Sequence, residues 1–233
     1  MKIAILGYGK MGKVIEKNAL SRGHEIVLRK SAADGFDGLL QADVAIDFSI
    51  PDAAVANISE CLNNGIPVIS GTTGWLENYH EMVSLCEENK AAFIYGSNFS
   101  LGVNLFFELN ERLSQLMSNY PDYKVAMEEI HHTQKLDKPS GTSITLANSV
   151  INNIKYNDWN IEKEAQDSLY IDVKRIENVP GTHLVSYNSE VDSIEIKHTA
   201  HNREGFALGA IIAAEWLVGK TGVFTMKDVL GLN

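Results

Sequence analysis

The chain has 233 residues, 45% of them hydrophobic and 21% charged, which is enough for one large domain or two small ones with a sizeable core. The net charge of −10 disfavours nonspecific binding to nucleic acid or to an anionic membrane. No segment approaches the roughly 18 apolar residues of a membrane span, and the apolar run at the N-terminus is too short for a signal peptide. We therefore predict a cytoplasmic protein that binds neither nucleic acid nor membrane. Cys61 and Cys86 are too few for a disulfide scaffold and are predicted to be reduced core thiols.

The first hundred residues alternate between short apolar runs and helical patterns. Strands are expected at 2–6, 24–28, 44–48, 67–70 and 91–95, and helices at 10–22, 52–64 and 75–89. Continuous apolar runs of this length are typical of strands that are buried on both faces of a parallel sheet. The alternation predicts a right-handed, doubly wound parallel sheet.

The pattern changes near Asn98. Helices are expected at 101–116 and 141–154, and strands at 123–130, 168–176, 183–187 and 193–199. Several strands with few helices between them predict an antiparallel or mixed sheet, and therefore a second domain of the α+β class. A strongly apolar helix is expected at 206–218.

A glycine motif follows the first predicted strand. Residues 7–12 fit the pattern G-x-G-x-x-G and open an amphipathic helix, which is the context that favours dinucleotide binding. Gly7 permits a tight turn, Gly9 lets the backbone approach a pyrophosphate, and Gly12 allows close packing of helix on strand. The alternative is an ordinary strand–helix turn without a ligand.

Arg29 and Lys30 stand near the end of the second predicted strand, where an NAD-selective site carries Asp or Glu. Their positive charges attract the 2′-phosphate of NADPH, whereas a carboxylate would accept a hydrogen bond from the ribose of NADH. The sequence therefore favours NADPH. The alternative is a pair of exposed basic side chains that bind no ligand.

Two further loops follow predicted strands at the carboxyl edge of the sheet, where ligands bind in such folds. The loop 71–74, Gly-Thr-Thr-Gly, is expected either to pass close to a nicotinamide and its ribose or to form an ordinary turn. Asp47 and Ser49 are expected either to form a polar rim of the site or to cap the following helix.

The segment 129–142 concentrates groups that suit proton transfer and anion binding. His131, His132 and Lys135 supply imidazoles and a positive charge. The stretch 139–142, Pro-Ser-Gly-Thr, starts a helix whose unpaired N–H groups and hydroxyls suit an anion. These groups predict a site that holds a small carboxylate or phosphate compound and moves a proton. The alternative is a solvated loop.

The acidic residues of the same segment are expected to have lesser roles. Glu128 and Glu129 are predicted to form a partly solvated pair near the site, because an unpaired buried carboxylate is costly. Asp137 is predicted to orient a neighbour or to cap the helix rather than to act as a base.

These motifs occur in the order seen in bacterial dihydrodipicolinate reductases, a family that nearly the whole chain resembles. The block H-H-x-x-K-x-D-x-P-S-G-T at 131–142 is the specific part, and the resemblance continues through 98–104, 180–183 and 198–203. It implies an α/β fold with a Rossmann-like dinucleotide-binding domain, residues 1–100 plus 203–233. An α+β domain for substrate binding and oligomerisation, residues 101–202, is inserted in it. Family members are usually homotetramers assembled through the second domain.

The resemblance implies NAD(P)H-dependent reduction of 4-hydroxy-tetrahydrodipicolinate (dihydrodipicolinate) to tetrahydrodipicolinate, a step of lysine biosynthesis through diaminopimelate. His131 is the implied general acid/base and Lys135 a second proton donor. The dicarboxylate substrate would be bound by His132, Lys135, Ser140, Gly141 and Thr142. The cofactor, NADPH or NADH or both, would be bound by Gly7, Tyr8, Gly9, Lys10, Met11, Gly12, Arg29, Phe48, Gly71, Thr72, Thr73, Ser97, Asn98 and Phe99. No metal is expected.

Two other functions are weighed against this one. The chain could be another NAD(P)-dependent amino- or imino-acid dehydrogenase, such as an aspartate dehydrogenase on a similar scaffold. It could also be a regulator that binds NADP without turnover. Neither needs the combination of His-His-x-x-Lys with Pro-Ser-Gly-Thr at 131–142.

Overall fold

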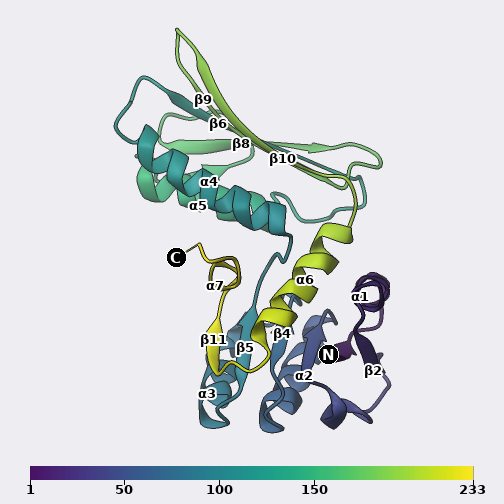
Figure 1. Cartoon of the computed structure of the whole chain (residues 1–233). Coiled ribbons are helices and arrows are strands. Elements are labelled where there is room, and N and C mark those ends of the chain that lie inside the picture. The colour runs from purple at the N-terminus through teal and green to yellow at the C-terminus, as the bar shows by residue number, and fades with distance from the viewer. Residues whose placement is uncertain (233) are drawn as a thin grey trace. The chain divides into compact units, whose positions relative to one another are not determined.

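A computed structural model describes residues 1–232, and the chain in it forms two compact units (Figure 1). The first unit comprises Met1–Leu101 together with the segment from Arg203 onward, and the second comprises Gly102–Asn202. No helix in the described part of the chain is long and apolar enough to cross a membrane.

The first unit is built on a six-stranded sheet in the order β11-β5-β4-β3-β1-β2, in which every neighbouring pair is parallel. Its strands are β1 (Lys2–Leu6), β2 (Glu25–Lys30), β3 (Val44–Asp47), β4 (Val68–Ser70), β5 (Ala92–Tyr95) and β11 (Gly222–Phe224). Its helices are α1 (Lys10–Ser21), α2 (Pro51–Asn63), α3 (Tyr79–Glu88), α6 (Glu204–Leu217) and α7 (Met226–Leu230), with short 3-10 turns at Leu39–Gln41 and Leu76–Asn78.

Alternate residues of the parallel strands feed two separate cores. Ile3, Ile5 and Ile46 pack on one face with α1, α6 and α7, whereas Ala4 and Phe93 pack on the other face with α2 and α3. Helices therefore cover both faces of the sheet, which buries the apolar side chains that its strands carry on both faces. The predicted doubly wound parallel sheet is confirmed.

The second unit is a mixed five-stranded sheet in the order β10-β9-β6-β8-β7, with two helices. Strand β9 runs antiparallel to β6 and β10, whereas β8 runs parallel to β6 and β7. The elements are α4 (Leu101–Met117), β6 (Lys124–His131), α5 (Gly141–Asn153), β7 (Asp158–Asn160), β8 (Ser168–Arg175), β9 (Gly181–Asn188) and β10 (Ser193–Ala200). The predicted α+β class of this part of the chain is confirmed.

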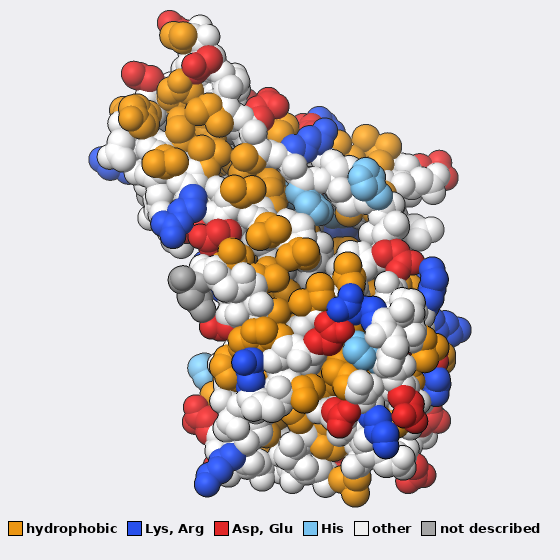
Figure 2. Space-filling view, viewed as in Figure 1, with side chains coloured by type: hydrophobic (Ala, Val, Ile, Leu, Met, Phe, Trp, Pro, Cys, Tyr) orange, Lys and Arg blue, Asp and Glu red, His pale blue; other side chains and the backbone are white. Residues whose placement is uncertain are grey.

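Both helices of the second unit pack on one face of its sheet (Figure 1). Phe106 of α4 and Leu146 of α5 share a core with Met127, Ile171 and Tyr187 of the strands. Another side of α4 exposes three leucines: Leu105, Leu109 and Leu116. Figure 2 shows hydrophobic side chains gathered over this helix.

The short elements β7, β11 and α7 were not predicted. The two strands have three residues each and α7 has five, so none is long enough to show a period in its apolar residues. Cys61 and Cys86 are both free and buried, in agreement with their prediction as core thiols.

Candidate active site

One candidate site is a pocket in the first unit, at the carboxyl edge of its sheet. There the order of strands reverses between β1 and β3, which is where ligands bind in open parallel sheets. The pocket has a volume of about 320 Å³ and is lined by Gly7, Tyr8, Gly9, Lys30, Ser31, Ala32, Phe48, Ser49, Ile50, Ala53 and Asn57.

The glycine turn has the shape that a dinucleotide requires. A Cβ on Gly7, whose φ is +101°, would lie 2.1 Å from the carbonyl oxygen of Phe48, and a Cβ on Gly12 would lie 2.4 Å from that of Gly7. Gly9 faces open space, with nothing within 4 Å of a built Cβ. Helix α1 begins directly after Gly9 with no side-chain cap, so its first N–H groups are available to a phosphate. These features fit a bound pyrophosphate.

Of the two residues expected at a polar rim or a helix cap, Ser49 lines the pocket, but Asp47 is buried and does neither, because Ile50 is the N-cap of α2. Its carboxylate is fully buried and accepts four hydrogen bonds, from Ser49 Oγ at 2.7 Å, Asn57 Nδ2 at 2.9 Å, Ser70 Oγ at 2.8 Å and Thr72 Oγ1 at 2.7 Å. Burial raises the pKa of Asp47, and these hydrogen bonds oppose that rise. Asp47 therefore ties the loop after β3 to the loop after β4.

Arg29 lies beside the pocket but does not line it. Its guanidinium forms an ion pair of 2.5 Å with Glu16, which also accepts a hydrogen bond from Tyr8 Oη. The residues of this strand end that do line the pocket are Lys30 and Ser31, and Ser31 was missed because a serine there carries no distinctive signal.

The other predicted cofactor residues lie at the same edge or in α1. The rings of Phe48 and Phe99 are 5.8 Å apart, and a Cβ on Gly71 would lie 2.4 Å from the Phe48 ring. Of the predicted residues, the pocket lining contains Gly7, Tyr8, Gly9 and Phe48, whereas Lys10, Met11, Gly12, Gly71, Thr72, Thr73, Ser97, Asn98 and Phe99 lie outside it.

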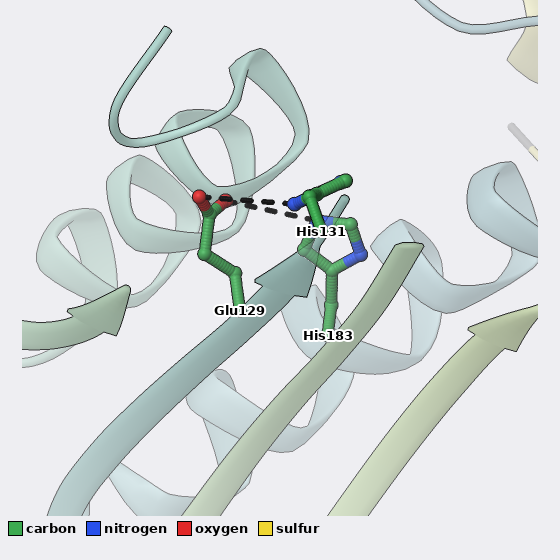
Figure 3. A group of neighbouring side chains, drawn as sticks. All are labelled: Glu129, His131 and His183. Carbon is green, nitrogen blue, oxygen red and sulfur yellow. Dashed lines mark ion pairs between the residues drawn. The ribbon is translucent and has the colours of Figure 1, made fainter. Parts of the chain in front are cut away.

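The second unit has a candidate site of its own, which is built by strand register. Glu129 of β6 lies opposite His183 of β9, and His131 at the end of β6 lies opposite Arg175 at the end of β8. Residues that are directly opposite in a sheet point to the same face, so these four side chains converge. Figure 3 shows the carboxylate of Glu129 facing both imidazoles.

Glu129 is the centre of this cluster, and the expectation of a partly solvated Glu128–Glu129 pair was wrong. Glu129 has no exposed surface, whereas Glu128 points to the other face of the sheet and pairs with Lys174. One oxygen of Glu129 accepts hydrogen bonds from Ser140 N at 2.9 Å, from Ser140 Oγ and from Ser143 Oγ at 2.5 Å. Burial alone would raise the pKa of Glu129, but these hydrogen bonds outweigh it and lower the pKa to about 2.

The two histidines of the cluster are neutral at neutral pH. Burial lowers the pKa of His131 to about 4; Glu129 and Asp137 oppose this shift, and Lys135 and Arg175 add to it. Burial likewise lowers the pKa of His183 to about 3. The ring centroids of His131 and His183 are 5.0 Å apart, and the Nδ1 atoms of both rings are buried without a hydrogen-bond partner.

Lys135 and Asp137 form an ion pair of 2.8 Å in the loop that follows β6. Asp137 therefore holds Lys135, and its predicted role as a helix cap was wrong, because Ser140 caps α5 by accepting a hydrogen bond from Ser143 N. Gly141 faces open space, and Thr142 is half-buried in the first turn. The predicted helix start is thus present. His132 is half-buried next to His131.

Glu129, His131 and His183 offer three possible metal ligands within 4.8 Å of one another. The guanidinium of Arg175 already lies 3.0 Å from Glu129, and its positive charge would repel a metal cation. The hydrogen-bond donors and the positive charge around Glu129 therefore suit an ion-paired, hydrogen-bonded network better than a metal centre.

Sequence reasoning gave no role to Arg175 and His183, and it placed Glu129 near the site but as a partly solvated residue. Glu129 shares the buried face of β6 with Met127 and His131, so strand alternation was a usable signal for its burial. Arg175 and His183 come from later strands, and only the register of the sheet brings them to His131.

The first unit is Rossmann-type and has a glycine turn that suits a dinucleotide. The second unit carries imidazoles and a lysine at a helix start. Together in one chain, these features define a pyridine-nucleotide-dependent oxidoreductase. The chain belongs to the dihydrodipicolinate reductase family. The models of its N-terminus and C-terminus match residues 1–99 and 102–230.

Curated relatives extend this match over almost the whole chain. A 4-hydroxy-tetrahydrodipicolinate reductase of Christiangramia forsetii is 54% identical over 99% of this chain and 98% of its own length. Another from Thermosipho africanus is 33% identical over 99% of this chain and 98% of its own. The solved dipicolinate-bound dihydrodipicolinate reductase from Paenisporosarcina sp. TG-14 shares the fold, with a TM-score of 0.76, 22% identity and 98% coverage of both chains.

Proposed function

We propose that the protein reduces 4-hydroxy-tetrahydrodipicolinate to tetrahydrodipicolinate in the diaminopimelate route to lysine. Membership of the dihydrodipicolinate reductase family supports this activity over the aspartate dehydrogenase and the non-catalytic regulator. One observation carries the proposal. His131, Lys135 and the start of α5 lie together in the second unit, and the first unit of the same chain has a glycine turn suited to a dinucleotide.

The substrate is a cyclic imine with two carboxylates, so the protein must hold negative charge and supply a proton. The helix start at Ser140, Gly141 and Thr142 suits one carboxylate, and His132 and Lys135 suit the other. The reduced nicotinamide supplies the hydride when it is bound.

His131 acts as the general acid/base and Lys135 as a second donor. His131 is neutral in the free protein, since burial keeps its pKa at about 4. The two negative charges of the substrate raise that pKa and favour the protonated imidazole, which then donates a proton to the ring. The 4-hydroxyl leaves as water, so the step adds one hydride and one proton and releases one water.

NADPH is the favoured cofactor, and NADH is the alternative. Lys30 and Ser31 line the pocket at the end of β2, and no carboxylate is among the lining residues of that pocket. A positive charge and a hydroxyl suit the 2′-phosphate, whereas NADH selectivity uses an acidic residue at this place. Arg29 would join them when it is released from Glu16.

The protein is proposed to be a cytoplasmic homotetramer that assembles through its second unit. Within residues 102–202, α4 and α5 cover one face of the sheet, and the other face carries the ion pairs of Lys174 with Glu128 and Asp172. A sheet face without a helix layer is a natural surface for a second copy of the chain. A biosynthetic role that consumes reduced nicotinamide supports a cytoplasmic location.

A coupled assay tests the activity. Dihydrodipicolinate synthase generates the unstable substrate, and the oxidation of NADPH or NADH is followed by absorbance. We expect oxidation that depends on both enzymes and is faster with NADPH. An active synthase without oxidation of either cofactor would refute the proposal.

A further inference from the structure

The two halves of the site in the second unit share one buried carboxylate. One oxygen of Glu129 accepts three hydrogen bonds from the first turn of α5, through Ser140 and Ser143. These are the residues whose backbone orients the helix start toward an anion. The Glu129 carboxylate therefore fixes the carboxylate-binding half.

The other oxygen of Glu129 points to the proton-transfer half. It lies 3.0 Å from Arg175 Nη2 and 3.8 Å from His131 Nδ1. The same Arg175 nitrogen donates to the carbonyl oxygen of Asp137 at 2.6 Å, and Asp137 pairs with Lys135. Glu129 and Arg175 thus connect His131 to the loop that carries the second proton donor.

A carboxylate at this position is not explained by packing. Glu129 is fully buried on the face of β6 that also carries Met127, where an apolar side chain would fill the core without the cost of removing a charge from water. Burying this charge requires four hydrogen-bond donors in a fixed arrangement: the N–H and Oγ of Ser140, the Oγ of Ser143 and the Nη2 of Arg175. Such an arrangement restrains the side chains that it joins.

We propose that Glu129 is a positioning residue of the reductase: it holds His131 and the start of α5 in fixed relation, so that the proton donor and the carboxylate site act on one substrate molecule. The proposal rests on the proposed function. Glu129 itself has no exposed surface, so in this proposal it acts through these groups and not on the substrate directly.

Glu129→Gln changes the proton-transfer half and leaves the carboxylate-binding half intact, because an amide has one acceptor group and one donor group. The amide oxygen can still accept from Ser140 and Ser143, which keeps the helix start in place. The amide NH₂ then faces Arg175 and His131, so that side loses its negative charge. We expect kcat to fall about 100-fold with little change in KM, the cost of a misplaced reacting group.

Glu128→Gln is the matched control. Glu128 is the neighbouring carboxylate on the same strand, but it points to the opposite face and pairs with Lys174. We expect its kcat and KM to stay within about twofold of the wild type when size-exclusion chromatography shows the same assembly for both variants, because Glu128 faces away from His131 and the start of α5. Equal kcat in Glu129→Gln and Glu128→Gln would overturn the positioning role.

A second readout needs no substrate. An NMR titration of His131 in the free protein should show a lower pKa in Glu129→Gln than in the wild type, because the negative charge of Glu129 raises it. The other titratable and charged groups that face His131 are the same in both proteins: Lys135, Asp137, Arg175 and His183, whose ring centroid lies 5.0 Å from that of His131. An unchanged titration would show that Glu129 does not act on His131 and would overturn the proposal.

Ser143→Ala keeps the proposal testable if Glu129→Gln does not fold. It removes one donor to Glu129 and leaves the carboxylate and Arg175 in place. The loss of one hydrogen bond should raise KM about three- to tenfold. An unchanged KM in a folded Ser143→Ala would overturn the link between Glu129 and the helix start. An inactive wild type would instead refute the proposed function, while the substrate-free titration still reports on Glu129.

Discussion

Replacement of His183 by glutamine should make the protein less sensitive to acid. His183 is 5% exposed, and burial lowers its pKa from 6.5 to about 3. Below the unfolded pKa the unfolded chain binds a proton that the folded chain does not, so the free energy of unfolding falls as the pH falls. His183→Gln removes this contribution, and its amide can still contact Ser140 Oγ, which lies 3.2 Å from His183 Nε2.

The size of the effect follows from the two pKa values. At about pH 5 the unfolded histidine is protonated and the folded one is neutral, a difference worth about 2 kcal/mol at 1.36 kcal/mol per pH unit. At about pH 7 the difference is nearly zero. The wild type should therefore lose about 2 kcal/mol more than His183→Gln over this range.

Urea unfolding at both pH values, at one protein concentration, measures this difference directly. The exposed His80 of the first unit provides the control substitution, His80→Gln. Equal losses of unfolding free energy in the wild type and His183→Gln would refute the argument that burial keeps His183 neutral.

Three substitutions test other parts of the site. Lys135→Ala should lower kcat/KM by about two to four orders of magnitude in steady-state assays, the usual worth of a positioned proton donor, and an effect below about tenfold would remove Lys135 from the mechanism. Gly7→Ala should abolish the thermal shift caused by NADPH, because its Cβ would lie 2.1 Å from a carbonyl oxygen; Gly23→Ala, also at positive φ but in open space, should keep that shift. Arg29→Asp should raise KM for NADPH more than for NADH, and unchanged values for both would show that Arg29 misses the 2′-phosphate.

The fold could be predicted from the sequence because the patterns that indicate its strands, helices and turns are local. Strands β1 and β5 of the first unit each carry four consecutive apolar residues, and the glycine turn stands between a strand and an amphipathic helix. The start of α5 was also predictable, since Ser140 and the glycine after it are typical of a helix N-terminus.

The network around His131 was not predictable because it depends on sheet register. Arg175 reaches His131 through the parallel pairing of β6 with β8, and His183 reaches Glu129 through the antiparallel pairing of β6 with β9. A shift of either pairing by one residue would turn these side chains to the other face of the sheet. Local patterns in the sequence do not specify that register.

The transfer of deuterium tests the central claim most directly. The purified protein is incubated with synthase-generated substrate and with NADPH that carries deuterium at both positions of nicotinamide C4, and the product is analysed by mass spectrometry. The account predicts tetrahydrodipicolinate that contains one deuterium, formed more slowly but with the same label by His131→Gln. A product without deuterium, or no product from a folded wild type, would contradict it.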